Sequence, residues 1–164
     1  GINLGHNTSS CFRIRKWNKY FLFLKSNKHK QQKERGIGYH TFNLYAFAII
    51  KDIGGIVKKE FWETKKIKKA LRYITTQTYV NAVNVNRFGS SYNPIGFEIA
   101  LVMEIFQNYF LNEKKHVKEK WINSQLQRHY SRKNGLMCNN TTDPRTLAAR
   151  MYEAIRLKDY KVDI

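Results

Sequence analysis

Three side chains in this sequence, Glu98, His40 and Tyr92, could carry acid–base chemistry because each lies in or just before an apolar segment. Glu98 stands near the start of the apolar stretch 95–110, where burial would raise the pKa of a carboxyl and fit it for general acid or base work. The alternative is a carboxylate that answers the positive end of a helix or pairs with an arginine. We therefore expect Glu98 to be either a catalytic group or a buried structural charge.

His40 stands at the start of another apolar segment, and imidazole titrates near neutral pH, which suits proton transfer. A capping or core histidine is the other interpretation. Asn43 follows three residues later, so on a helix the two side chains would share a face and could line a pocket together. Tyr92 could supply a phenol beside His40, or it could pack against its own loop.

Three arginines, Arg87, Arg145 and Arg150, could each bind a carboxylate or a phosphate through two parallel hydrogen bonds. Glu153 follows Arg150 by three residues, which favours a structural ion pair on one helix face for that arginine.

The sequence predicts no metal and no cofactor. Its five histidines, at positions 6, 29, 40, 116 and 129, lack ligand spacing. No HExxH, CxxC, calcium-loop or glycine-rich phosphate-loop motif is present. Cys11 and Cys138 would allow one disulfide, but two free thiols are the favoured interpretation.

The segments that must position these residues alternate between wholly apolar and amphipathic. Residues 39–53 are apolar on nearly every side, which is typical of a helix buried all round, and Gly54 and Gly55 end it. Residues 60–80 carry apolar side chains at helical spacing with lysines on the other side, which predicts one amphipathic surface helix.

The same alternation then returns. Asn93 is expected to cap a second buried helix over residues 94–112, with Pro94 as its first residue. A polar segment with a narrow apolar stripe follows at 112–130, which predicts a second surface helix.

Asp143 and Pro144 open a third helix by the same device, so the pattern repeats with a period of about 50 residues. This period predicts an all-α fold of stacked antiparallel helical hairpins with alternating buried and surface helices. We expect a basic lead-in segment at residues 1–36 and a helical-hairpin domain of about three hairpins at 37–164.

The net charge of +18 arises from 30 lysines and arginines against 12 aspartates and glutamates. A field of that size attracts polyanions such as nucleic acid, anionic membrane or acidic polysaccharide, although AT-rich codon usage would produce the same composition. No apolar run reaches the roughly 20 residues that a membrane span needs, and the first ten residues contain no signal-peptide core. The compartment is therefore left open.

The stretches GYHTFNLYAFA, at 38–48, and YNPIGFEIALV, at 92–102, resemble inner helices of the (α/α) toroid, or six-hairpin barrel, of carbohydrate-active enzymes. A closed toroid needs about six hairpins, so the resemblance implies that this chain is a fragment, about half of a larger domain, and that the missing half belongs to the same polypeptide. The resemblance places one set of residues near a single rim: His40, Asn43, Arg87, Tyr92, Asn93, Glu98, Asp143 and Arg145.

The function that this resemblance implies is lyase, hydrolase or epimerase chemistry on an acidic polysaccharide or oligosaccharide. In a lyase, Asn43 or Arg87 would neutralise the uronate carboxylate, His40 or Tyr92 would serve as base, and Tyr92 would serve as acid. In a hydrolase or an epimerase, Glu98 would matter more. The further residues expected to bind substrate are Asn93, Asp143 and Arg145.

Two other functions fit the same sequence. One is a non-catalytic basic helical module that binds nucleic acid through lysine-rich outer helices, since phosphate attraction requires little more than such a stripe. The other is an interaction scaffold of stacked helical hairpins.

Overall fold

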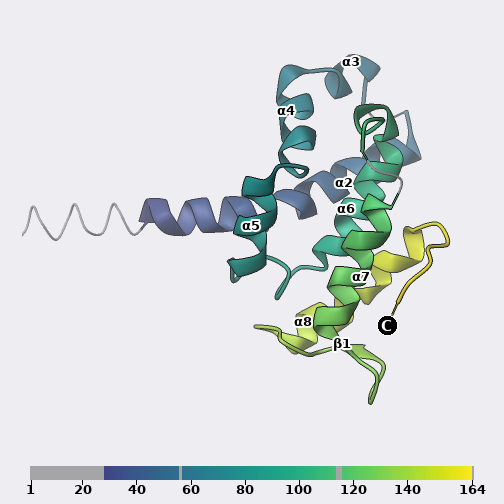
Figure 1. Ribbon diagram of the computed structural model, residues 1–164. Coiled ribbons are helices and arrows are strands. Elements are labelled where there is room, and N and C mark those ends of the chain that lie inside the picture. The colour runs from purple at the N-terminus through teal and green to yellow at the C-terminus, as the bar shows by residue number, and fades with distance from the viewer. Residues whose placement is uncertain (1–27, 56, 114–115, 164) are drawn as a thin grey trace, which may run out of the picture. The chain divides into compact units, whose positions relative to one another are not determined.

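The computed structural model describes residues 28–55, 57–113 and 116–163 (Figure 1). Its internal contacts divide the chain into two units, residues 1–34 and 35–164. In the first unit the described residues, 28–34, are helical and almost all exposed. The rest of the expected lead-in segment, including Cys11, lies outside the described residues.

The second unit is mostly helical, which confirms the predicted all-α class apart from one very short sheet. No helix in the described part of the chain combines the length and apolar character that crossing a bilayer requires. After the helical residues 35–38, the elements follow in this order: α2 (His40–Ile53), α3 (Lys59–Trp62), α4 (Lys65–Tyr73), α5 (Gln77–Val85), α6 (Ile95–Ile105), η1 (Gln107–Tyr109), α7 (Val117–His129), β1 (Tyr130–Ser131), β2 (Leu136–Met137), α8 (Pro144–Ala149) and η2 (Arg150–Arg156).

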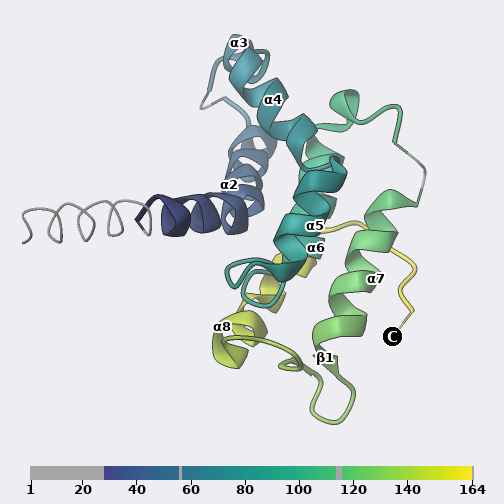
Figure 2. The ribbon, with the colours of Figure 1, turned by 60° about the vertical axis from the view of Figure 1, so that its left-hand side comes forward.

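Helix α6 is the centre of this unit. Every residue from Ile95 to Met103 is buried, including the one carboxylate, Glu98, as expected for a helix buried all round. The helix ends at Ile105, however, and the remainder of the expected range 94–112 includes exposed residues. Helices α2 and α7 both pack against it, and Figure 2 shows α6 lying between them. Gly96 allows the approach of α7, because a Cβ at this position would lie 2.4 Å from the carbonyl oxygen of Trp121.

Helix α2 runs parallel to α6. Near the two helix starts, Thr41 bonds to Glu98, and near the two helix ends Lys51 Nζ donates to the carbonyl of Ile105 at 3.0 Å. Since the partners follow in the same order along both helices, the helices point the same way.

The segment that contains α8 and η2 follows α6 in the same direction. Its beginning bonds to the loop before α6, through Thr142 N and the carbonyl of Ser91 at 3.0 Å. Its middle bonds to Glu98 of α6, and its end bonds to Glu104 through the hydroxyl of Tyr160 at 2.5 Å. Three segments therefore run parallel, with α6 in the middle.

The helices between these segments run in the opposite direction. Trp62, ahead of α4, contacts Phe47 late in α2, whereas Ala70 bonds to His40 at the start of α2. Helix α7 returns along α6 in the same manner: Gln125 Nε2, late in α7, donates to the carbonyl of Ser90 just before α6 at 3.3 Å.

The expected surface helix over 60–80 is in fact three helices. The side chains of Thr64 and Thr76 accept hydrogen bonds from backbone N–H groups at 3.5 and 3.2 Å, so each threonine caps a new helix. These caps interrupt the apolar period that suggested one continuous helix. Trp62 takes the buried position, and its neighbour Phe61 is exposed.

Helix α2 was expected to be buried on every side, but only one of its faces is buried. Its buried residues form one face (Thr41, Leu44, Tyr45 and Ala48), whereas Phe42 is 39% and Ile53 67% exposed. The chain also departs from the prediction near its end: β1 and β2 form an antiparallel pair within an expected loop, and the third helix changes from α8 to the 3₁₀ helix η2 at Arg150.

We expect Gly96→Ala to lower the free energy of unfolding by about 1–3 kcal/mol, because the added methyl forces α6 and α7 apart in a well-packed core. Gly36→Ala is the matched control, because nothing lies within 4 Å of a Cβ at that position. Urea denaturation of both variants measures the difference. Equal stability of the two variants would show that the α6–α7 approach is looser than the structure has it.

Candidate functional site

A set of buried polar groups gathers around Arg150, the first residue of η2. Glu98 is fully buried and accepts hydrogen bonds from Arg150 Nη2 at 2.5 Å and from Thr41 Oγ1 at 2.5 Å. Arg150 also donates from Nε to Glu153 Oε1 at 2.7 Å, and from Nη1 to Oδ1 of Asn93. We call these five residues the Arg150 cluster. One guanidinium thereby joins the start of α6 to a segment about fifty residues further along the chain.

Asn93 belongs to this cluster and is not the helix cap that the sequence suggested. Helix α6 begins at Ile95 after Pro94, and no side chain caps it. The amide of Asn93 is used elsewhere: Nδ2 donates to the carbonyls of Gly38 at 3.0 Å and Phe88 at 2.6 Å. The side chain therefore ties the entry of α2 to the loop before α6.

The cluster places two buried carboxyls beside a single guanidinium. Burial raises the pKa of Glu98, and the opposing pull of Arg150 and Thr41 is smaller. Burial and the neighbouring charge of Glu98 raise the pKa of Glu153 to about 7. One proton on the two carboxyls makes the cluster electrically neutral, which is the form that a buried site favours.

Glu153 also has an unused oxygen. Arg150 binds Oε1, whereas Oε2 is buried and has no hydrogen-bond partner among the described residues. The buried hydroxyl of Tyr45 likewise lacks one, and its pKa is raised to about 12, first by burial and then by the charge of Glu153. A carboxyl with a pKa near 7 can give or take a proton at neutral pH.

Aromatic side chains surround the exposed edge of the cluster. The ring of Tyr39 lies 5.6 Å from Phe88, 6.3 Å from Phe42 and 6.3 Å from Tyr92, measured between ring centroids. The Arg150 guanidinium lies 4.8 Å from the Phe42 ring, which connects these rings to the cluster. We call Tyr39, Phe42, Phe88 and Tyr92 the aromatic rim.

Cations lie over the aromatic rim as well. The guanidinium of Arg87 is 4.6 Å, and that of Arg35 is 5.8 Å, from the centroid of Phe88. The predicted site residues Arg87, Tyr92, Asn93 and Glu98 are thus brought together at the starts of α2 and α6. Their catalytic and binding roles stay predictions.

His40 and Tyr92 do not meet. The His40 ring faces α4, where Nε2 lies 3.0 Å from the carbonyl of Ala70 and Tyr73 contacts the ring. Burial lowers the pKa of His40. Asn43, which was expected to share a pocket with His40, is exposed on α2. His40 is thus half-buried beside α4, and its role in proton transfer stays a prediction.

Asp143 and Arg145 lie on α8 outside the cluster. Asp143 caps the helix, since Oδ1 accepts from the N–H of Thr146 at 3.0 Å and Oδ2 accepts from its hydroxyl at 2.7 Å. These bonds lower the pKa of Asp143. The capping role follows the sequence prediction, and Arg145 is exposed one residue after Pro144.

Sequence reasoning missed Thr41, Tyr45 and the contact of Arg150 with Glu98. It favoured Glu153 as the partner of Arg150, and that pair is confirmed. It also offered pairing with an arginine as one of two interpretations of Glu98, and the structure shows that this arginine is Arg150. The signal that was available was the isolated Glu98 in an apolar helix, because a buried carboxylate requires a partner from elsewhere in the chain.

The described residues contain no group of three or more histidine, cysteine, aspartate and glutamate side chains arranged to hold a metal ion. Cys138 carries a free thiol, which is what the favoured interpretation of the two cysteines predicted for this residue.

Comparison with known proteins gives one informative match. The chain is 34% identical over 146 residues to a curated protein of Haloferax volcanii that is named archaeal glycosylation protein Q. The match covers 85% of this chain and 36% of the relative, so the chain spans about a third of the length of that protein. No protein-family model matches the chain, and no solved structure matches it.

We expect Arg150→Met to lower the free energy of unfolding by about 3–5 kcal/mol, because it leaves Glu98 and Glu153 buried without a countercharge. Arg145→Met removes an equal charge from an exposed position and should change stability by less than about 0.5 kcal/mol. Chemical denaturation measures both variants. If the two variants lose similar amounts of unfolding free energy, Arg150 does not stabilise the fold more than an exposed arginine does.

The raised pKa of Glu153 predicts that stability falls as the pH rises from about 4.5 to about 7. In this window the folded protein keeps a proton that the unfolded chain has released, so deprotonation opposes folding. The loss should be about 3 kcal/mol, at roughly 1.4 kcal/mol per pKa unit. Glu153→Gln should flatten the measured stability–pH curve, whereas Glu60→Gln, at an exposed position, should not. An unchanged slope in Glu153→Gln would refute the assignment.

Proposed function

We propose that this chain forms part of an (α/α) toroid that processes saccharides, and that the aromatic rim with its arginines binds an acidic sugar. Two observations support the toroid. Three segments run parallel while the helices between them return, which is the direction pattern of inner and outer helices in stacked hairpins. The relative is also much longer than this chain, which leaves room for further hairpins.

The observation that carries the proposal is the meeting of guanidinium groups and aromatic rings at the starts of the parallel segments. Aromatic faces pack against the C–H faces of a sugar ring, and a guanidinium binds a carboxylate through two parallel bonds. Arg87 and Arg35 lie over Phe88, so guanidinium groups and an aromatic ring meet at one place. A uronate offers a flat ring and a carboxylate together.

The relative supports the same class of ligand, because its name describes a protein of glycosylation. In this proposal Arg87 neutralises the carboxylate of the sugar, and Tyr39 and Tyr92 supply phenols beside the bound ring. Glu98 acts from inside the structure by holding Arg150. Glu153, fully buried, holds the same arginine from the other side, and its pKa is raised to about 7 by burial and by the charge of Glu98. A lyase, a hydrolase or an epimerase could use these groups.

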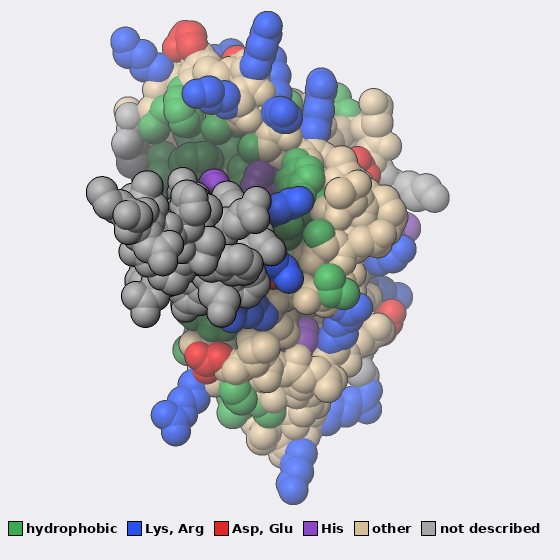
Figure 3. Space-filling view, turned by 90° about the vertical axis from the view of Figure 1, so that its left-hand side faces the viewer, with side chains coloured by type: hydrophobic (Ala, Val, Ile, Leu, Met, Phe, Trp, Pro, Cys, Tyr) green, Lys and Arg blue, Asp and Glu red, His purple; other side chains and the backbone are tan. Residues whose placement is uncertain are grey.

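The alternative of nucleic-acid binding requires a continuous cationic surface. Figure 3 shows lysine and arginine side chains scattered over the visible face, with other kinds of side chain between them. Positive charge spread in this way attracts polyanions without selecting among them. In this proposal the aromatic rim provides the selectivity.

We expect tetragalacturonate to bind, and Arg87→Gln to weaken its Kd by about tenfold or more, because a lost carboxylate partner costs at least ~1.4 kcal/mol. Lys133→Gln removes the same charge from an exposed turn and should leave the Kd unchanged. Isothermal titration calorimetry measures both variants, and product analysis with the wild type tests for turnover.

Single-stranded DNA of matched charge is the competing ligand in the same assay. If it binds as tightly as the uronate, and both variants weaken the two ligands equally, the protein is a polyanion-binding module and the saccharide proposal fails.

A further inference from the structure

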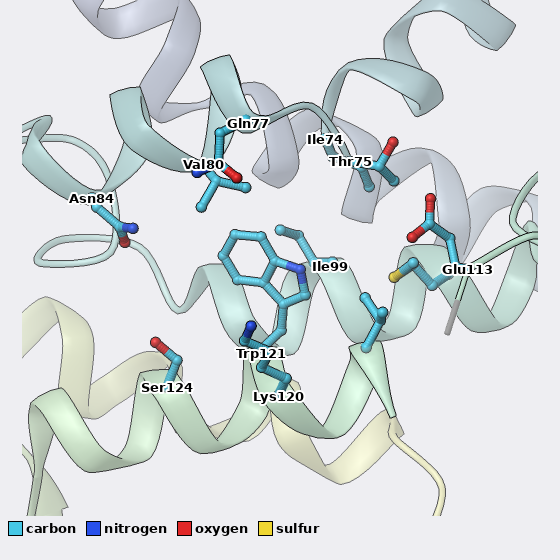
Figure 4. Close-up of a pocket in the computed structure, with 12 residues that line it drawn as sticks. Ile74, Thr75, Gln77, Val80, Asn84, Ile99, Glu113, Lys120, Trp121 and Ser124 are labelled. Carbon is cyan, nitrogen blue, oxygen red and sulfur yellow. The ribbon is translucent and has the colours of Figure 1, made fainter. Parts of the chain in front are cut away.

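A cavity of about 350 Å³ lies between α5, α6 and α7 (Figure 4). None of the residues that line it belongs to the Arg150 cluster or to the aromatic rim. The two sites use different sides of α6: Ile99 and Met103 line the cavity, whereas Glu98 bonds to Arg150. The cavity is therefore separate from the proposed uronate site and can bind a different ligand.

The middle of the cavity is aromatic and apolar. Figure 4 shows the indole of Trp121 rising from α7 into the open space, with Val80 of α5 above it and Ile99 of α6 beside it. The Trp121 side chain is only half-buried, so part of it is available to a ligand. Such a surface receives the flat apolar face of a ring.

The edges of the cavity are polar. Gln77 and Asn84 extend from α5, and Ser124 from α7. The carbonyl oxygen of Asn84 already accepts from Arg128 Nη1 at 2.7 Å, which fixes the amide and leaves its nitrogen as a donor. Neutral amides and hydroxyls at the edge of an apolar floor are typical of sites that fix ligand orientation.

The charges in the cavity are balanced. Lys120 and Glu113 both line it, one of each sign, so the charged side chains that line the cavity itself offset each other. This balance sets it apart from the arginine-rich aromatic rim.

We infer that this cavity is a second saccharide site, and that it takes a neutral hexopyranose ring. A pyranose with equatorial hydroxyls has C–H groups on both faces and hydroxyls around its edge, which matches an indole platform bordered by amides. The volume stands at the lower end of the roughly 300–1,000 Å³ of ligand pockets, which suits a single ring.

The test is a titration with cellotriose, whose glucose units carry only equatorial substituents, followed by NMR of the ¹⁵N-labelled tryptophan indoles. We expect the Trp121 signal, assigned through Trp121→Phe, to shift on binding. Trp121→Ala should weaken the Kd by about tenfold or more, as loss of a central aromatic contact does. The double variant Gln77→Ala with Asn84→Ala, which changes two exposed side chains and keeps the indole, should weaken it as well.

The rim variant Arg87→Gln separates this inference from the proposed function. It should leave cellotriose binding unchanged, while Trp121→Ala should leave tetragalacturonate binding unchanged. An absent Trp121 shift, a Kd unaffected by the amide double variant, or cellotriose binding lost in Arg87→Gln would each overturn the second site. The double variant decides the question if Trp121→Ala does not fold.

Discussion

The arrangement of this protein depends on the burial of Glu98. A carboxyl in the middle of an apolar core has to be neutralised or paired, because a lone buried charge costs several kcal/mol. Arg150 meets this requirement from a segment far along the chain, and its remaining donors bind Glu153 and Asn93. The paired guanidinium thus decides where the last helical segment lies against α6.

The same requirement connects the core to the surface. Asn93 accepts from Arg150 on one side and donates to Gly38 and Phe88 on the other, so the loop before α6 and the entry of α2 are held to a single geometry. The residues of the aromatic rim belong to these two segments. A surface of partly exposed rings is therefore supported by a buried polar network, which keeps it in one arrangement without help from a bound ligand.

Helix α6 gives this protein two surfaces with different chemistry. One side of the helix carries Glu98, which bonds to Arg150, and another side carries Ile99 and Met103, which line the cavity beside Trp121. In the two proposals made above, an acidic sugar binds at the aromatic rim and a neutral sugar binds in the cavity. A protein that handles a glycan of mixed composition would gain from two such sites, because linked contacts along one chain raise the overall affinity.

The sequence by itself determined the features that depend on neighbouring residues. The apolar run of α6 predicted the burial of residues 95–103, Asp143 before Pro144 predicted a cap, and the spacing of Arg150 and Glu153 predicted their pair. Each follows from helical geometry over three or four positions, for which no knowledge of the rest of the fold is needed.

Only the tertiary structure decided which distant groups meet. Glu98 lies 52 residues from Arg150 in the sequence. The sequence predicted that Asn93 caps α6, whereas its side-chain amide donates to the carbonyls of Gly38 and Phe88. Phe42 is 39% exposed although its segment was expected to be buried on every side. Burial and pairing of this kind depend on which surfaces pack together. The local spacing of apolar residues does not identify the distant residue that a side chain will contact.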